Sequence, residues 1–238
     1  MKELETKYYF QNLESFEHKE LFEGCIYPWE ALIKVKEYLK EKVVEPDLKV
    51  NKAKSTAENC TITGNYFIDE GTVISPNAII EGPVHIGKNC KIKPGAYVRP
   101  GTITGDDVEI GYNAEVKNSI VQNGCKIASL TFVGDSVLGK SARIGSGVVT
   151  ANRRFDQANV WAKIGKEQID MEIDFFGAVV GDNTRLGANA TTIPGTFIGP
   201  YSWIFPTCQV RGFIPAEKRM LPKEEYIMMD NPRVELKS

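Results

Sequence analysis

The sequence predicts a mainly β protein that winds as a single-stranded parallel β-helix of about seven coils. The first observation is an aliphatic residue, once replaced by threonine, at every sixth position. This column contains Ile62, Ile68, Ile74, Ile80, Ile86, Ile92, Val98, Thr104, Ile110 and Val116. The second observation is a small or β-branched residue four positions later, as at Ala78 and Cys90, and the third is a glycine that often follows the aliphatic residue, as at Gly87 and Gly111.

A six-residue period fits neither an α-helix nor one long alternating strand. It fits a short strand followed by a corner, and three such sides close one prism-shaped coil of about eighteen residues. The pattern slips between Val116 and Leu138, continues to Thr150, and returns from Val180 to Val210. An ordinary β-sandwich is the alternative, but it does not explain so uniform a column, whereas stacked identical positions bury one another.

The amino-terminal segment, residues 1–50, is predicted to be helical and to end in a linker. Pro28 is well placed near a helix start. Apolar residues follow at helical spacing: Leu32, Val35, Leu39 and Val43. One amphipathic helix is therefore expected here, while residues 1–26 form a cap or a short helix on the column.

The β-helix itself is predicted for residues 51–213. The repeat is lost over residues 153–176, where Trp161 and apolar neighbours indicate a protruding loop that docks on another surface. Residues 214–238 contain three prolines and many charges and are expected to cap the open end of the column.

The bulk composition limits the possible partners. The chain has 238 residues, 42% of them hydrophobic and 25% charged, and a formal net charge of −2. This balance gives no argument for nucleic acid or for an anionic membrane as a partner. The charged start MKELETKYYF and the lack of a long apolar segment predict a cytoplasmic protein. Five scattered cysteines and two histidines predict neither a disulfide framework nor a metal site.

Several segments resemble a known family, the hexapeptide-repeat transferases. They are YPWEALIKVKEYL, AYVRPGT, EVKNSIV, SLTFVGDSVLG and IGSGVVTANRRFD. More narrowly, residues 27–182 resemble the carboxy-terminal acyltransferase half of bifunctional sugar-1-phosphate nucleotidylyltransferase/acetyltransferases. The resemblance implies that the β-helix is left-handed, that the protein is a homotrimer with sites between neighbouring columns, and that acetyl-CoA or another acyl-CoA is the co-substrate. No L-x-x-G-x-G-T-R signature occurs near the amino terminus, so a nucleotidylyltransferase domain is not expected.

The resemblance also shows what the pocket lacks. In the family, a histidine in H-L-[ST]-Y-x-G-D takes the proton from an amino sugar, because its pKa lies near the working pH. In SLTFVGD, Ser129 occupies the position of the histidine and Phe132 that of the tyrosine, and Arg143 replaces an asparagine. The catalytic residue is therefore unassigned. Of the two histidines, His85 is expected at an outward corner of the column and His18 in the unplaced amino-terminal part.

Other positions match the family's ligand-binding residues. Arg99 and Lys117 correspond to residues that hold the sugar phosphate, Glu115 keeps its place, and Asn152 matches an asparagine near the sugar. Arg143 adds positive charge, and guanidinium and ammonium groups suit phosphate oxygens. The alternative interpretation is that these are solvated surface cations.

Three functions remain open. The first is an acyl-CoA-dependent transferase that acts on a sugar phosphate or nucleotide sugar mainly by positioning. The second is a non-catalytic trimer that binds such a ligand as the regulatory or scaffold partner of a nucleotidylyltransferase. The third is a structural assembly module. In any trimer, the loop at residues 153–176 is a plausible arm across the cleft.

Overall fold

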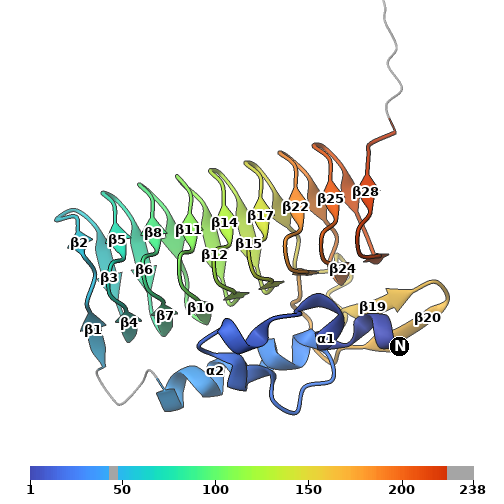
Figure 1. Ribbon diagram of the computed structural model, residues 1–238, viewed down its shortest axis with the longest axis horizontal. Coiled ribbons are helices and arrows are strands. Elements are labelled where there is room, and N and C mark those ends of the chain that lie inside the picture. The colour runs from blue at the N-terminus through green and yellow to red at the C-terminus, as the bar shows by residue number, and fades with distance from the viewer. Residues whose placement is uncertain (43–47, 224–238) are drawn as a thin grey trace, which may run out of the picture.

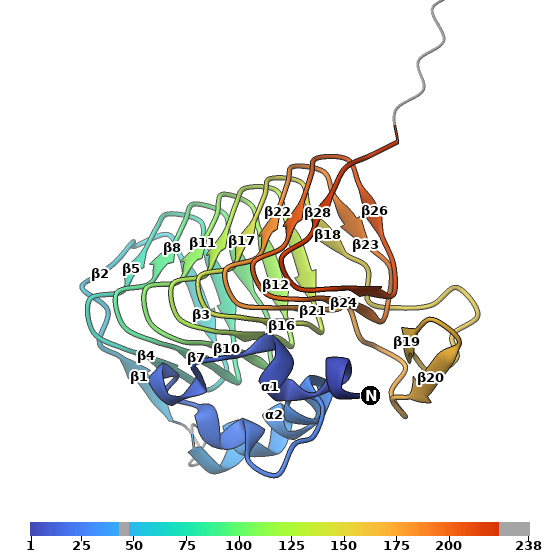
Figure 2. The same cartoon turned by 45° about the vertical axis from the view of Figure 1, so that its right-hand side comes forward.

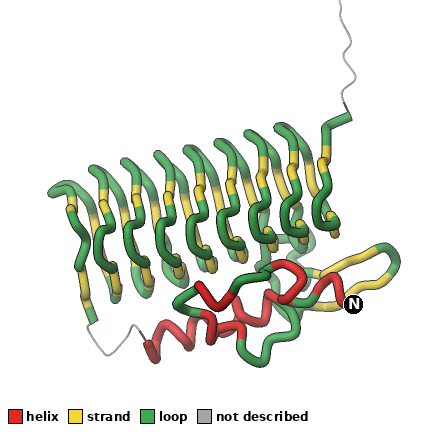
Figure 3. The backbone as a smooth tube through the Cα atoms, viewed as in Figure 1, coloured by secondary structure: helices red, strands yellow, loops and turns green. Residues whose placement is uncertain are grey.

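The computed structural model describes residues 1–42 and 48–223, which form a parallel β-helix with a helical layer along one side (Figure 1). Each turn of the chain contributes short strands to three sheets that form the faces of a prism, and loops make the corners (Figure 3). All neighbouring strands within these three sheets are parallel and lie one coil apart. The predicted left-handed parallel β-helix is confirmed.

We call the three faces sheets A, B and C. Sheet A contains β1 (Lys49–Asn51), β4 (Tyr66–Ile68), β7 (Val84–Ile86), β10 (Thr102–Thr104), β13 (Ile120–Val121), β16 (Val137–Leu138), β21 (Ala178–Val180), β24 (Thr196–Ile198) and β27 (Phe213–Ile214). Sheet B contains β2 (Ser55–Thr56), β5 (Val73–Ile74), β8 (Lys91–Ile92), β11 (Glu109–Ile110), β14 (Lys126–Ile127), β17 (Arg143–Ile144), β22 (Arg185–Leu186), β25 (Trp203–Ile204) and β28 (Arg219–Met220). Sheet C contains β3 (Thr61–Thr63), β6 (Ile79–Glu81), β9 (Tyr97–Val98), β12 (Glu115–Lys117), β15 (Phe132–Gly134), β18 (Val149–Thr150), β23 (Thr191–Thr192) and β26 (Gln209–Val210).

The column has more coils than the predicted seven. Nine strands stack in sheets A and B and eight in sheet C, so the described residues form nine coils, the last without its third strand. One of the two additional coils falls where the six-residue repeat slips. Ile110 lies beside Ile127, and Ile127 beside Ile144, so these coils have 17 residues because one side is one residue short. The inward column therefore continues through the slip.

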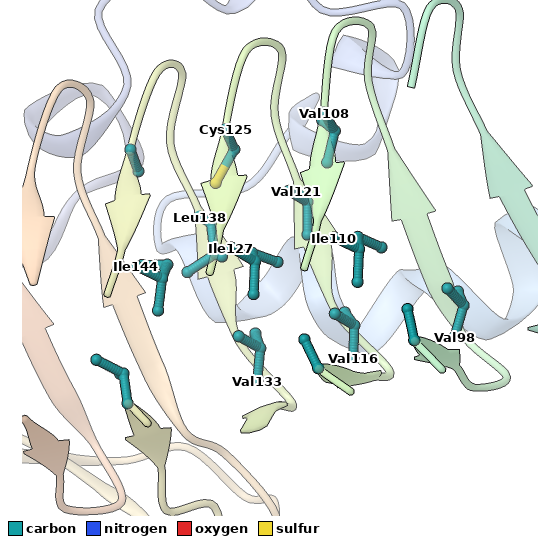
Figure 4. Packing of buried hydrophobic residues seen from close by; sticks show 14 of the residues in the cluster. Val98, Val108, Ile110, Val116, Val121, Cys125, Ile127, Val133, Leu138 and Ile144 are labelled. Atoms are coloured by element: carbon teal, nitrogen blue, oxygen red, sulfur yellow. The ribbon is translucent and has the colours of Figure 1, made fainter. Parts of the chain in front are cut away.

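Figure 4 shows this column from inside, where aliphatic side chains of the three sheets point toward one another. Members from the middle coils are fully buried, as at Ile110, Val116, Val121 and Val133. Each buried aliphatic side chain stabilises the fold by about 1.5–3 kcal/mol relative to leaving it in water. The same inward position on successive coils is therefore the main source of stability of the column.

Asparagine and aspartate occupy many corners because they tolerate a positive φ angle. Asn118 has a φ angle of 43° and Asp135 one of 47°, both at the corner between sheets C and A. Their short polar side chains lie one coil apart, and the carboxylate of Asp135 accepts a hydrogen bond from Asn118. The same corner positions the candidate site.

The amino-terminal segment covers the outer face of sheet A (Figure 2). It contains η1 (Lys2–Leu4), α1 (Thr6–Tyr9), η2 (Leu13–Ser15), η3 (Lys19–Phe22) and α2 (Pro28–Lys42). Leu32, Val35 and Leu39 of α2 are buried as the helical spacing predicts, and Val43 lies outside the described residues. The segment lies along the side of the column and packs against outward side chains of sheet A, including Ile103 and Phe197.

This layer makes the three faces different. Sheet A strands such as β10 and β24 are buried on both sides, whereas strands of sheets B and C commonly expose the outward residue. A strand that is covered on both faces needs apolar residues in both directions, which explains the apolar outward residues of sheet A. Sheets B and C remain as the faces that a ligand or another subunit can reach.

The loop predicted at 153–176 is not without regular structure: it contains an antiparallel hairpin of β19 (Trp161–Ile164) and β20 (Glu167–Asp170). Val160 and Phe176 at its base are buried against the amino-terminal layer and sheet A, so the hairpin packs on its own chain. The column also does not end at 213, because β27 and β28 extend it to Met220. Residues 224–238 of the predicted cap lie outside the described residues. Among the residues that are described, no helix has the length and apolar character to cross a membrane.

Candidate functional site

Three polar residues form a ladder at the corner where sheet C turns into sheet A. Asn118, Asp135 and Asn152 follow β12, β15 and β18, so they lie on three successive coils. Asp135 is only 2% exposed. Its carboxylate accepts hydrogen bonds from the side-chain amides of Asn118, at 2.7 Å, and Asn152. A buried carboxylate needs such donors, and this one organises the side chains around it.

Lys117 joins the ladder from sheet C. Its ammonium group lies 3.1 Å from the Asp135 carboxylate, and its side chain is 25% exposed while that of Asp135 is 3% exposed. The pair therefore has a buried anion and a cation that reaches the surface. Lys117 keeps part of its hydrogen-bonding capacity for a ligand, since an ammonium group has three donors.

Arg99 lies one coil before Lys117 on the same face. Its guanidinium donates to the Glu115 carboxylate at 2.7 Å and lies 5.7 Å from the centre of the Tyr97 ring. The hydrogen bond with Glu115 raises the pKa of Arg99, so the guanidinium is charged at any working pH. Both side chains of this pair are about one third exposed, and a pair so accessible is worth about 0–1 kcal/mol. A dianionic phosphate can therefore compete with Glu115 for the guanidinium.

Phe175 completes the site from the far end of the hairpin segment. Its ring contacts two cations: the Lys117 ammonium group is 4.6 Å from the ring centre and the Arg153 guanidinium is 4.5 Å from it. The backbone of Arg153 also pairs with that of Phe175 in an isolated antiparallel bridge. The hairpin segment therefore starts and ends at the site, and its two ends pair with each other.

The other predicted residues are more dispersed. Phe132 lies on sheet C beside Glu115, and its ring covers Gly134, where an added Cβ would lie 2.7 Å from the ring. Ser129 is half-buried at the corner between sheets B and C. Arg143 is exposed on sheet B, between Lys126 and Arg185. Within one subunit, the structure brings together Arg99, Lys117, Glu115 and Asn152 but places Arg143 on another face.

Neither histidine belongs to this site. His85 points outward, as predicted, but it lies in the middle of β7 of sheet A and not at a corner. It is not a surface residue, because the amino-terminal layer covers it and leaves 6% exposed. His18 lies in that layer and contacts His85. Both histidines of the chain are thus buried on a different face from the ladder. No imidazole of this subunit can take a proton at the site.

Sequence reasoning missed two features of the site. It did not recognise Asp135 as the centre of the ladder, although Asn118, Asp135 and Asn152 recur at a spacing of 17 residues, which is the length of the shorter coils. It also missed Phe175, for which no local signal exists, because a non-repetitive segment returns it to the site. Asp156, in the segment after the ladder, is a poor base, because the hydrogen bond from Arg154 lowers its pKa to about 2.

A cavity of about 760 Å³ lies beside the hairpin and near the site. Its lining includes three cations, Arg154, Lys163 and Arg211, and the ring of Trp161. Arg154 directly follows Arg153 of the site, so the cavity and the ladder are neighbours along the chain. The cations and the aromatic ring are suited to an anion with a flat ring.

Two family models match the chain. The GMPPB C-terminal domain matches residues 62–155, which contain the ladder, Arg99 and Lys117. The hexapeptide repeat of succinyl-transferase matches residues 177–200, after the hairpin. Both matched regions belong to the column.

Curated relatives extend the similarity to most of the chain. The "Bifunctional protein GlmU" of Methanococcus vannielii is 36% identical over 201 residues, which are 84% of this chain and 47% of the relative. The "Bifunctional sugar-1-phosphate nucleotidylyltransferase/acetyltransferase" of Sulfurisphaera tokodaii is 36% identical over 149 residues, which are 63% of this chain and 37% of the relative. The chain thus spans less than half the length of these two relatives.

Among solved structures, the UDP-N-acetylglucosamine acyltransferase from Campylobacter jejuni matches with a TM-score of 0.38 and 14% identity, covering 68% of this chain and 69% of that one. The repeat, the stacked sheets and the sequence similarity agree with one another. The chain forms a hexapeptide-repeat β-helix, and its sequence resembles the carboxy-terminal part of the bifunctional sugar-1-phosphate nucleotidylyltransferase/acetyltransferases.

Proposed function

We propose that this protein is an acyl-CoA-dependent acyltransferase that acts on a sugar phosphate or a nucleotide sugar. The observation that carries the proposal is the convergence of Arg99, Lys117 and Asn152 along one edge of sheet C, in a chain related to sugar-phosphate acetyltransferases. Arg99 and Lys117 bind the phosphate, and Asn152 bonds to the sugar. Asp135 is a positioning residue, because it holds Lys117 and Asn152 in one orientation.

The acyl donor is an acyl-CoA, such as acetyl-CoA. Its phosphates and adenine suit the cavity beside the hairpin, where Arg154, Lys163 and Arg211 supply charge and Trp161 supplies a stacking surface. Transfer forms a bond between the acceptor atom of the sugar and the acyl carbon, and breaks the thioester carbon–sulfur bond. The acceptor's proton goes to solvent or to the departing thiolate, since this subunit offers no imidazole at the site.

Positioning then contributes most of the rate. Holding the acceptor and the thioester in a near-attack geometry can supply about 7–11 kcal/mol of barrier lowering, whereas a general base contributes about 10²–10⁴-fold. An enzyme without the base is therefore expected to be slower than one with it, but not inactive. An acceptor hydroxyl or amine with a lowered pKa would lose less rate from the missing base.

One observation favours a second function. The half-buried Ser129 occupies the position of the family's base, and both histidines are committed to the buried face of sheet A. A chain that keeps the phosphate-binding residues and lacks the base fits a non-catalytic trimer that binds a sugar phosphate or nucleotide sugar, as the partner of a nucleotidylyltransferase. Such a protein would bind the same ligands without turnover.

Acetyl-CoA and a panel of amino-sugar phosphates and nucleotide sugars distinguish these two functions. Release of the free thiol that depends on the acceptor supports the transferase. Thermal stabilisation by the sugar ligand without thiol release supports the binder and contradicts the transferase. If no ligand of the panel stabilises the protein or is turned over, both proposals are wrong.

Restoring the missing groups gives a sharper test. We expect the double variant Ser129→His with Phe132→Tyr to gain acetyl transfer by about 10²–10⁴-fold, because it introduces an imidazole at the position of the base. The measurement is thiol release at saturating acetyl-CoA. The single variant Phe132→Tyr is the matched control and should stay near the starting rate. A double variant that binds ligand but gains no activity would show that the pocket differs from that of the relatives in more than its base.

We also expect a homotrimer, because apolar side chains are exposed where a neighbouring column would contact sheet C. Ile79 and Val149 on this sheet, and Tyr112 and Leu130 at its corner with sheet B, are 36–62% exposed. Leu130 and Tyr112 lie on successive coils and are joined by a backbone hydrogen bond. Light scattering should give three times the chain mass at micromolar concentration, and Leu130→Glu should give monomers. A wild-type protein that is monomeric at this concentration would contradict the trimer.

A further inference from the structure

A second cluster of chemical groups lies on the outer face of sheet A, under the amino-terminal layer. His18 comes from the amino-terminal layer and His85 from β7, so 67 residues of chain separate them. Their facing ring nitrogens, Nε2 of His18 and Nδ1 of His85, are 3.0 Å apart. Glu17 adds a carboxylate oxygen, and the three ligand atoms all lie within 4.8 Å of one another. The proposed function uses none of these groups.

The hydrogen bonds around His18 fix its tautomer. Tyr38 donates its only hydroxyl proton to the Glu20 carboxylate at 2.9 Å. The Tyr38 oxygen, 2.9 Å from Nδ1 of His18, must therefore accept the proton on that nitrogen. Nε2 of neutral His18 is then an unprotonated lone pair directed at His85 and Glu17. The His85 ring is also hydrogen-bonded to the backbone of Thr104. Partners of this kind orient the histidines of metal sites.

The surroundings favour a cation between neutral imidazoles. His18 is 4% exposed and His85 is 6% exposed, and burial lowers the pKa of His18 to about 3 and that of His85 to about 4. The rings of Phe16 and Phe67 pack on the two imidazoles. The pKa of Glu17 is raised, first because the surrounding protein partly shields its carboxyl group from water and then by the nearby carboxylates of Asp106 and Asp69, which Lys88 and Lys52 counteract only in part. Neutral nitrogen ligands beside an excess of carboxylates suit a divalent ion.

We propose that Glu17, His18 and His85 bind one divalent first-row transition-metal ion, for which Zn²⁺ is the probe. Two imidazole nitrogens bound to one tetrahedral Zn²⁺ lie about 3.3 Å apart, and the centres of their rings about 5.2 Å apart. The nitrogens, now 3.0 Å apart, need to separate by a few tenths of an ångström, and the ring centres, now 4.2 Å apart, by about 1 Å. His85 would carry its proton on Nε2 in the bound state. Glu17 is exposed and can swing toward the ion, which also gives the ion a path from solvent. The fourth position is open to water.

The ion would tie the amino-terminal layer to the β-helix. Glu17 and His18 belong to the segment between η2 and η3, whereas His85 belongs to the column. A metal that binds groups from both parts stabilises only the docked arrangement, so it raises the stability of the folded protein by mass action. The spacing of the histidines in the sequence gives no sign of this site.

The test uses the full chain without a histidine tag, stripped with EDTA and titrated with Zn²⁺. We expect one equivalent to bind and the unfolding temperature to rise. Co²⁺ in place of Zn²⁺ should give visible absorption without a thiolate charge-transfer band, because the ligands are nitrogen and oxygen. With only two histidines in the chain, NMR of the imidazole nitrogens should show both rings shift together on adding Zn²⁺.

Variants separate this site from chance binding. His85→Gln should abolish stoichiometric binding, and Tyr38→Phe, which removes the oxygen that orients His18, should weaken it by about 10–100-fold. Glu17→Gln should weaken it by at least about tenfold, whereas Glu14→Gln, which changes an exposed carboxylate paired with Lys19, should leave it unchanged. If His85→Gln does not fold, the Glu17 and Tyr38 variants still decide the question. Any one of three results would overturn the proposal: no saturable binding, a visible thiolate band, or the same affinity in Glu17→Gln as in the wild type.

Discussion

Lys117→Met should lower the affinity for a sugar phosphate by about tenfold to a hundredfold. A hydrogen bond to a charged group contributes about 1.5–3 kcal/mol, and each 1.4 kcal/mol corresponds to a factor of ten in affinity. Methionine keeps an unbranched stem against the Phe175 ring while it removes the ammonium group that lies 4.6 Å from the ring centre. Calorimetric titration with the ligand identified in the panel measures the change.

Two further variants make this result specific. Arg99→Ala should give a loss of similar size, since Arg99 is the second phosphate-binding group and its partner Glu115 is accessible to solvent. Lys36→Met, on the exposed face of α2, removes a lysine away from sheet C and should leave the affinity unchanged. If Lys117→Met and Lys36→Met behave alike while both proteins remain folded, the ladder is not the phosphate site.

Phe197→Ala should lower the free energy of unfolding by about 3–5 kcal/mol, the range for large-to-small changes of a buried aromatic residue. Phe197 is fully buried on the outer face of sheet A. Its ring contacts three others: Tyr9 at 6.0 Å and Trp29 at 5.6 Å in the amino-terminal layer, and Phe176 at 5.9 Å at the base of the hairpin. One side chain thus joins the column, the layer and the hairpin.

The loss should be concentrated in the layer. In a repeat protein each coil contacts mainly its neighbours. The loss of one side chain from the outer face of sheet A therefore need not unfold the column. Hydrogen exchange should therefore accelerate in α2 and the hairpin more than in sheets B and C. Chemical denaturation followed by Trp29 fluorescence, in a protein with Trp161 and Trp203 replaced by phenylalanine, should show an earlier transition. Phe155→Ala, at a fully exposed phenylalanine, is the control and should change stability by less than about 0.5 kcal/mol. If Phe197→Ala lowers the free energy of unfolding by less than about 1 kcal/mol, other contacts hold the amino-terminal layer on the column.

The candidate site was predictable in part, and the reason is geometric. The family resemblance pointed to Arg99, Glu115, Lys117 and Asn152, and these residues lie along one edge because residues at the same place on successive coils are neighbours. Arg143 fits the same repeat but lies on sheet B, because the face on which a residue lies depends on its position within the coil.

The sequence alone determined the β-helix, the inward column and helix α2, because these follow from local periodicity: a residue points inward or outward according to its place in a short strand. Only the tertiary structure decided which outward face is covered, that the slip in the repeat is two shortened coil sides, and that Phe175 returns to the site. It also decided that His18 meets His85. Contacts of this kind join residues far apart in the chain, and they depend on how whole layers pack, which no short pattern of residues encodes.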